Sequence, residues 1–140
     1  MEYNLHVAGA AQLVFLMTKC TFPRTSKPCP SCPWRVDQTA ADIPHFSIDL
    51  AEGLVETSPD ARGFGPGFQN KMFACHRSPE GEEFACAGWL AMVGNAHPRV
   101  RVAVMEGRLP VAALRPGNHW PELHETYGDV LAKLRATVDE

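Results

Sequence analysis

The sequence lacks the long apolar runs that would place it in a membrane or direct it for secretion. The longest apolar stretch near the start, Val7 to Met17, is interrupted by Gln12 and is shorter than the roughly 20 residues that cross a bilayer. Glu2 is the only charged residue before it, so the basic region that begins a secretory signal is missing too. We expect a cytoplasmic protein with no membrane association. Met17 is an alternative start, which would make residues 1–16 an N-terminal extension.

The chain also lacks an excess of charge of either sign. Its net charge is -3, so no long-range attraction draws it to nucleic acid or to anionic lipid. A local group of four arginines, Arg99, Arg101, Arg108 and Arg115, is interpreted as a solvated helix face, with a phosphate or nucleic-acid patch as the alternative. Nucleic acid is therefore disfavoured as a partner, and another macromolecular partner remains open.

The length and composition predict one folded domain, which we expect over residues 17–140. The chain has 140 residues, 45% of them apolar and 21% charged, as in an ordinary globular domain. Twelve prolines and eleven glycines indicate a loop-rich part. Residues 18–46 show neither helical nor strand periodicity. The fold class expected is a small α-rich single domain, with an irregular, cysteine-bearing N-terminal half and a helical C-terminal half.

Apolar spacing and capping residues predict four helices and one short strand. Ser47 is suited to cap a helix that runs to about Glu56. Further along the chain we predict a strand over 72–75 and helices over 86–93, 98–107 and 118–138. The last of these would begin at an Asn118 cap and carry Trp120, Leu123, Tyr127, Leu131, Leu134 and Val138 on one face.

Cysteines are few but unevenly placed, at positions 20, 29, 32, 75 and 86. An odd number in a reducing compartment makes a disulfide framework the weaker interpretation. Cys29 and Cys32 form a two-residue-spaced pair between prolines, which stiffen the turn and allow two thiolates to face one cation. Cys75 and Cys86 bracket a polar loop whose proline and glycine favour a turn that brings them together.

Four thiols from two separated segments predict a metal site at Cys29, Cys32, Cys75 and Cys86, around which the irregular half is organised. The alternatives are buried structural thiols and, less favoured, a redox pair. His76 is expected to support the site by hydrogen bonding to a ligand, or to replace one sulfur as a ligand. Cys20 is expected to be an ordinary thiol. The other histidines are interpreted as surface or capping residues: His45, His97, His119 and His124.

Three blocks around these cysteines resemble a known family. Cys29-Pro30-Ser31-Cys32-Pro33-Trp34-Arg35, Phe73-Ala74-Cys75-His76-Arg77-Ser78 and Cys86-Ala87-Gly88-Trp89-Leu90 resemble a bacterial and phage family catalogued as domain of unknown function 6283. The resemblance runs from about Lys27 to the C-terminus. It implies that four matched cysteines and one matched histidine act together, and it supplies no activity.

The spacing of the cysteines leaves the metal open between zinc and an iron–sulfur cluster, because both use four thiolates. The two-residue knuckle and the adjacent His76 favour zinc, toward which we lean. Pro33 after Cys32 and the neighbouring aromatic residues favour a cluster. Four protein ligands would close the coordination shell, which favours a structural ion over a hydrolytic one.

Residues for catalysis are not evident in the sequence. No serine, histidine and aspartate stand in a pattern that spacing alone supports as a triad. Glu80, Glu82 and Glu83 are interpreted as solubilising residues beside a helix start. A weaker alternative is an enzyme with an open metal site and Glu82 or Glu83 as base. We therefore expect a non-enzymatic protein and assign no catalytic residue.

Overall fold

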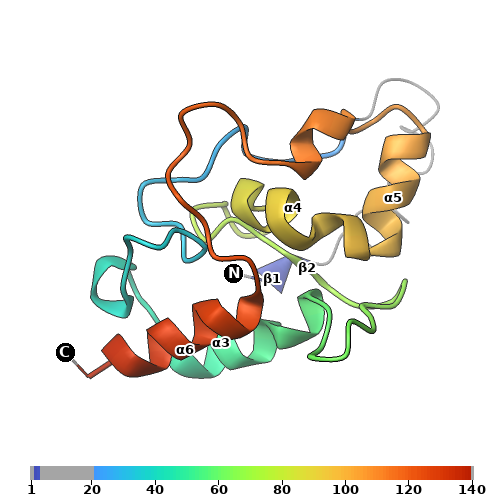
Figure 1. The fold of residues 1–140 in the computed structure, drawn as a ribbon. Helices are drawn as coiled ribbons and strands as arrows, with labels where there is room; N and C mark the ends of the chain where they lie inside the picture. Colours follow the sequence, from blue (N-terminus) through green and yellow to red (C-terminus); the bar gives the residue numbers. More distant parts are fainter. Residues whose placement is uncertain (1, 4–20, 140) are drawn as a thin grey trace.

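The computed structural model describes residues 2–3 and 21–139 (Figure 1). Met17 and Cys20, and all of the expected N-terminal extension except residues 2–3, lie outside the described residues. Four helices lie within them: α3 (Ile48–Gly53), α4 (Ala87–Val93), α5 (Pro98–Met105) and α6 (Tyr127–Thr137). Shorter 3₁₀ turns are η1 (Ala40–Asp42), η2 (Leu54–Thr57), η3 (Gly94–Ala96) and η4 (Val111–Leu114). Strand β1 (Glu2–Tyr3) pairs antiparallel with β2 (Met72–Phe73).

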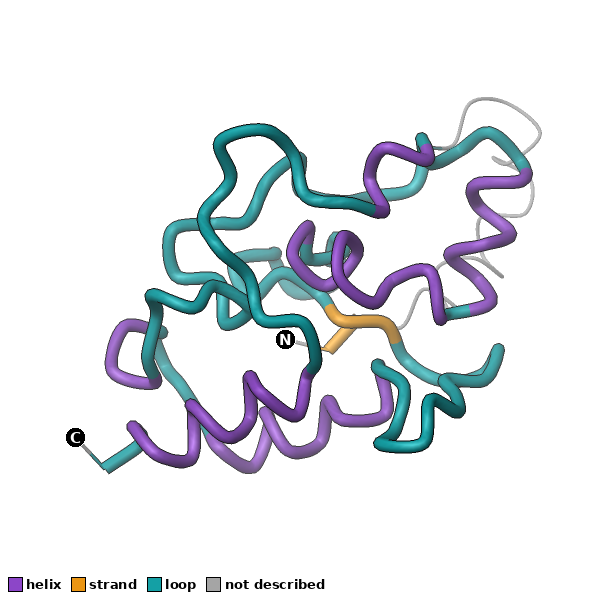
Figure 2. Tube along the Cα trace, viewed as in Figure 1, coloured by secondary structure: helices purple, strands orange, loops and turns teal. Residues whose placement is uncertain are grey.

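The helices are arranged on two sides of the β2 segment, with long loops between them (Figures 1 and 2). α3 and α6 lie side by side on one side, where the Tyr127 hydroxyl donates a 2.7 Å hydrogen bond to the Ala51 carbonyl. α4 and α5 lie on the other side. The fold is thus a small α-rich domain with little strand and many loops, as the sequence predicted.

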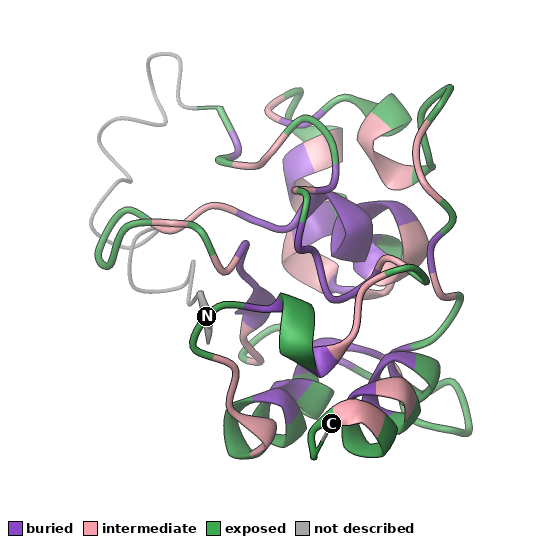
Figure 3. Ribbon diagram, turned by 90° about the vertical axis from the view of Figure 1, so that its left-hand side faces the viewer, coloured by how far each residue is buried: buried purple, intermediate pink, exposed green. Residues whose placement is uncertain are grey.

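The buried core extends from α4 to the contact between α3 and α6. α4 is buried along most of its length (Figure 3), and it ends at Val93, as the spacing predicted. Three rings join the two sides: Trp34 lies 6.2 Å from Phe73 and 5.7 Å from Tyr127, measured between ring centroids. Edge and tilted ring contacts of this kind add to the stability gained from burying the rings. Trp34 therefore ties the loop that follows Cys32 to the centre of the domain.

The prediction of a helix over 118–138 was wrong for residues 118–126, because α6 begins at Tyr127. Residues before it run extended beside the loop after Cys32: Val36 N donates to the Glu122 carbonyl (3.0 Å), and His124 N donates to the Trp34 carbonyl (2.9 Å). The helix is capped by Thr126, whose hydroxyl accepts from Asp129 N. A threonine three residues before an aspartate is a capping pattern, and it marked the true start.

Helix α5 begins at Pro98, as predicted, and its cap is His97. The His97 Nδ1 accepts a hydrogen bond from Arg99 N (3.1 Å), and its Nε2 lies 2.9 Å from the Asn70 carbonyl. These partners require the neutral ring with its proton on Nε2. The side chain is wholly buried. Of the other histidines, His45 and His119 are exposed and His124 is half-buried. None of the helices described here has both the length and the apolar character needed to cross a bilayer.

Acidification is expected to destabilise the fold through His97. Burial, with the charges of Arg99 and Arg101 adding to it, lowers the pKa of His97. As pH falls through about 6.5, the unfolded chain therefore binds a proton that the folded chain does not, and the free energy of unfolding decreases. A His97→Asn variant keeps a side chain able to cap α5. Urea unfolding between neutral pH and pH 5 should show a flatter pH dependence for the variant. Equal slopes would contradict this assignment.

Candidate metal centre

The first cysteine pair lies on a tight turn that the core holds in place. Cys32 N donates to the Cys29 carbonyl (3.1 Å), and Arg35 N donates to the Cys32 carbonyl (3.0 Å). Between them Trp34 is fully buried. The prolines of the sequence limit the conformations of this turn, and the tryptophan anchors its C-terminal end. Both thiols are thereby set at the surface of the core without regular secondary structure.

The second pair is brought together by a hairpin-like loop, as the sequence predicted. Cys75 N donates to the Phe84 carbonyl (2.8 Å), and Cys86 N donates to the Phe73 carbonyl (3.0 Å). At the tip, Gly81 has a positive φ of 86°, a conformation that glycine adopts without steric cost. Cys86 is also the N-cap residue of α4. The chain from 73 to 86 therefore presents both thiols beside each other at the start of a buried helix.

The segment that precedes the first pair joins this hairpin. Thr25 N donates to the Ala85 carbonyl (3.0 Å), and Ala85 N donates to the Pro23 carbonyl (2.9 Å). Ala85 bridges Ala74 on its other side. The Thr25 hydroxyl accepts from Ala87 N (2.9 Å) at the start of α4. These backbone pairings bring two parts of the chain, about 50 residues apart in sequence, to one place.

The thiols of both pairs come into contact. The Cys32 and Cys86 sulfurs lie 3.5 Å apart. Cys32 and Cys75 both act on the pKa of Cys29, so all four cysteines lie in one group. His76 joins it as well: its Nε2 lies 3.2 Å from the Cys29 sulfur and 3.0 Å from the Ser31 hydroxyl. The residues that the sequence singled out therefore lie together.

The electrostatics of the group favour one thiolate beside neutral thiols. Hydrogen bonds from Cys32 and Cys75 lower the pKa of Cys29 far below its usual range, with His76 adding to the effect and burial opposing it. The pKa of Cys32 is raised by its contacts with Cys29 and Cys86 and by burial. For Cys75, the contact with Cys29 and burial raise the pKa. A thiolate, and not a thiol, binds metal, so the lowered pKa favours Cys29 as a ligand.

The thiols are in pairwise contact and do not face one common centre. In the described part of the chain, no group of three or more His, Cys, Asp or Glu side chains is arranged to hold a metal ion as it stands. A shared ion would require the side chains to turn so that their sulfurs face one point. The four-cysteine metal site thus stays a prediction, and it is argued below as a proposal.

One residue near the centre was missed by the sequence reasoning. Lys133, on α6, donates from Nζ to the Pro33 carbonyl (2.9 Å) and to the Arg35 carbonyl (2.7 Å). Burial lowers its pKa to about 8, while the nearby Cys32 and Asp37 act in the opposite direction. From sequence, a lysine near the end of a helix is explained by the helix dipole alone. Its role in holding the turn depends on its contact with Pro33, which lies 100 residues earlier in the sequence.

Replacing Lys133 with methionine is expected to loosen the cysteine turn. The two carbonyls would lose a charged donor, which corresponds to about 1–3 kcal/mol in the free energy of unfolding. The matched control is Arg135→Met on the same helix. Its exposed ion pair with Glu52 contributes at most about 1 kcal/mol. Urea unfolding of both variants measures the difference, and equal losses would show that Lys133 does not hold the turn.

Several other candidates lie apart from the thiols or have local partners. Arg35 forms a two-bond ion pair with Asp37. Glu83 accepts from Gly81 N within its own turn (3.1 Å). The indole of Trp89 donates to the Thr57 carbonyl and so takes part in a contact away from the cysteines.

The arginine group is not the continuous solvated face that the sequence predicted. Arg101 and Arg115 are exposed, while Arg99 and Arg108 are half-buried. Arg99 donates to the Asn70 carbonyl (2.6 Å), and Arg108 pairs with Glu106. At least two of the four side chains therefore serve contacts within the fold.

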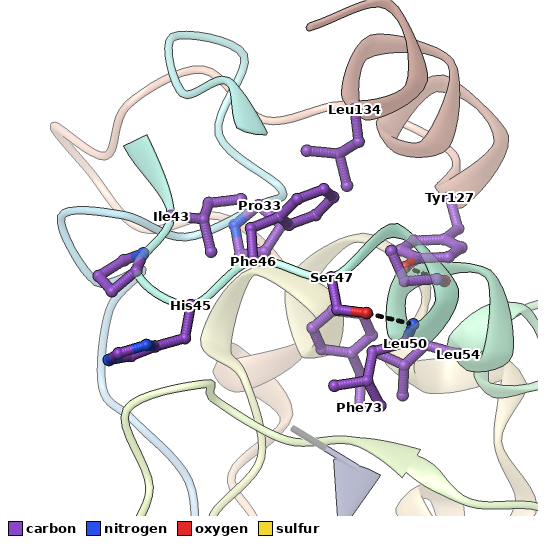
Figure 4. A pocket seen from close by; sticks show the side chains of 12 residues that line it. Pro33, Ile43, His45, Phe46, Ser47, Leu50, Leu54, Phe73, Tyr127 and Leu134 are labelled. Carbon is purple, nitrogen blue, oxygen red and sulfur yellow. Dashed lines mark hydrogen bonds between the residues drawn. The ribbon is translucent and has the colours of Figure 1, made fainter. Parts of the chain in front are cut away.

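A cavity next to the cysteine turn offers no room for a substrate. It lies between the turn, α3 and α6, where Pro33, Phe46, Phe73 and Leu134 line it (Figure 4). Its volume is about 20 Å³, enough for a single water molecule. The space beside the thiols is therefore closed by packing on this side.

Comparison with known proteins gives a family and no activity. No curated protein and no solved structure matches the chain significantly. One family model matches residues 24–140, and its description is "Family of unknown function (DUF6283)". The match spans both cysteine pairs, His76 and the helical half of the chain. The chain therefore belongs to the family of unknown function DUF6283.

Proposed function

We propose that this chain is a small metal-binding protein whose four cysteines, Cys29, Cys32, Cys75 and Cys86, hold a structural zinc ion. The observation that carries the proposal is the contact between thiols from two distant segments, with Cys32 and Cys86 3.5 Å apart. Thiolates on a tetrahedral zinc ion, with Zn–S bonds near 2.3 Å, are about 3.8 Å apart. Small side-chain rotations would therefore bring this pair to zinc geometry.

The chemistry of the donor set supports the same proposal. Thiolate is a preferred zinc ligand, and four of them close the coordination shell without a water position. His76 would then act as a hydrogen-bond donor to the Cys29 sulfur, as its 3.2 Å distance allows, and would support the ligand from outside the shell. No position would be left for a substrate, so the role proposed is structural and non-enzymatic.

The biological role proposed for such a centre is to stiffen a surface for another macromolecule. The ion would link the irregular first half of the chain to the hairpin and to α4, which regular secondary structure does not do. Two exposed apolar side chains beyond α4, Met105 and Val111, are candidates for that surface. A cytoplasmic location fits the proposal, because reducing conditions keep the thiols available as ligands.

An iron–sulfur cluster for redox sensing or electron transfer is the second candidate. Pro33 directly follows Cys32, and the buried rings of Trp34 and Phe73 lie in the two segments that carry the cysteines. Apolar shielding of this kind tunes a cluster. The thiolates of a cubane cluster bind different irons, however, and so lie further apart than four ligands of one ion. The 3.5 Å contact therefore favours zinc over a cubane cluster, while a two-iron cluster, which binds two thiolates on one iron, stays the alternative.

Metal analysis and an absorption spectrum of protein purified without oxygen test the two candidates together. The zinc proposal expects about one zinc per chain and no visible colour. Stoichiometric iron and acid-labile sulfide, with a broad band near ~400 nm from thiolate-to-iron charge transfer, would replace it by the cluster. Protein that binds neither metal after reduction and addition of zinc would contradict both.

A further inference from the structure

A second feature of the fold, away from the four thiols, is a half-open pocket of about 230 Å³. It lies where the chain around Arg24, the start of α4 and the stretch from η4 to Trp120 meet. Figure 1 shows η4 and the blue stretch that follows residue 20 lying together beside α4. The pocket is more than ten times larger than the cavity beside the cysteine turn. A site for a ligand is therefore available here.

The lining of this pocket combines an apolar floor with two positive charges. Leu90, Ala113 and the half-buried ring of Trp120 provide the apolar part, and Arg24 and Arg115 provide the charges. None of the lining residues that the structure describes is acidic. Neither guanidinium makes an ion pair with any residue that the structure describes. Each guanidinium can therefore bind a negatively charged group of a ligand without first breaking such an ion pair.

The close packing of Gly117 against Trp120 keeps the indole as one wall of the pocket. A Cβ atom at Gly117 would lie 2.7 Å from the Trp120 Nε1. That is too close for a side chain, so glycine fits at this position. The indole thus lies directly against the backbone of the loop. An aromatic ring in such a position offers a flat face for stacking.

We propose that this pocket binds a small planar organic anion, with its ring against Trp120 and its charged group between Arg24 and Arg115. A cavity of about 150 Å³ holds a benzene molecule, so the volume here admits one ring and one anionic substituent. Guanidinium groups pair with both carboxylate and phosphate oxygens. The shared chemistry is therefore a ring that carries an oxyanion.

Titration of the full chain with benzoate, followed by nuclear magnetic resonance of the tryptophan indole N–H groups, tests the proposal. The Trp120 signal is identified by its loss in a Trp120→Phe variant. We expect it to shift saturably, with a dissociation constant on the order of 1 mM for so small a ligand. Benzyl alcohol, which lacks the charge, should bind about tenfold more weakly or worse. Phenyl phosphate shows which oxyanion the two arginines prefer.

Variants distinguish binding in this pocket from nonspecific attraction of anions to the protein surface. Arg115→Gln, at an exposed position, should weaken benzoate binding about tenfold, and Ala113→Leu should abolish it by filling the pocket. The matched control is Arg62→Gln, in an exposed loop that does not line the pocket. The proposal is overturned if benzoate causes no saturable shift at Trp120. It is equally overturned if benzyl alcohol binds as well, or if Arg62→Gln weakens binding as much as Arg115→Gln.

Discussion

Replacement of Cys86 by serine is expected to abolish zinc binding and to lower the free energy of unfolding by at least about 3 kcal/mol, because metal binding contributes directly to folding in sites of this type. Cys86 is the N-cap residue of α4. Serine is a better N-cap than most residues, so the substitution favours the helix itself. Because Cys86 is buried, a serine hydroxyl there can also cost stability, so the loss is assigned to the metal site by comparison with metal-free wild type. Zinc content and urea unfolding measure the two effects.

Two comparisons make this experiment decisive. Wild-type protein stripped of metal by a chelator should show the same loss of stability as Cys86→Ser, because both lack the ion. Cys20→Ser removes a thiol that the proposal leaves out, and it should keep both the zinc content and the stability of the wild type. If Cys86→Ser retains one zinc and unfolds at the wild-type urea concentration, the four-cysteine site is wrong.

Replacement of Gly88 by alanine should destabilise the fold by about 1–3 kcal/mol through overpacking. A Cβ atom at this position would lie 3.0 Å from the Trp34 Cβ and 3.3 Å from the Cys32 sulfur. All three residues are buried, so the neighbours have little room to move. The substitution is also expected to displace the Cys32 thiol and to weaken zinc binding. Urea unfolding and competition with a zinc-binding dye measure these effects.

The matched control for Gly88 is the same substitution in another helix. Gly53, at the end of α3, has helical dihedral angles, and a Cβ atom added there would meet no atom within 4 Å. Gly53→Ala should therefore stabilise the fold by about 0.5–1 kcal/mol, because it reduces the conformational freedom of the unfolded chain. Opposite signs for the two variants would confirm that close approach, and not helix propensity, requires glycine at position 88. A stabilising Gly88→Ala would contradict it.

The sequence predicted those parts of the fold that depend on residues close together in the chain. Pro98 at the start of α5, Gly94 after α4 and the turn between Cys75 and Cys86 are all decided within a few residues. The sequence also predicted that the two cysteine pairs lie together, because two pairs from separate segments can share one metal ion. Four cysteine ligands alone do not decide which metal binds, so the sequence left the metal open between zinc and a cluster.

The errors arose where distant segments decide the outcome. Trp120 and Leu123 fit a helical spacing, but Trp120 closes a turn onto Gly117, and Leu123 belongs to a stretch that pairs with the chain around Trp34. The pairing supplies backbone hydrogen bonds that a helix would otherwise provide. The contacts of Lys133 with the cysteine turn depend on the same arrangement. Periodicity describes one segment at a time and does not reveal such partners.

The long distance in sequence between the cysteine turn and Lys133 has a consequence for synthesis of the protein. The two are separated by 100 residues, which a ribosome adds in about 5–20 s at 5–20 residues per second. Cys29 and Cys32 are thus made well before the residues that enclose their turn, and their thiols meet the surrounding solution during this interval. A zinc ion held by all four cysteines could protect them only once Cys86 has been made, which is still before Lys133 is added.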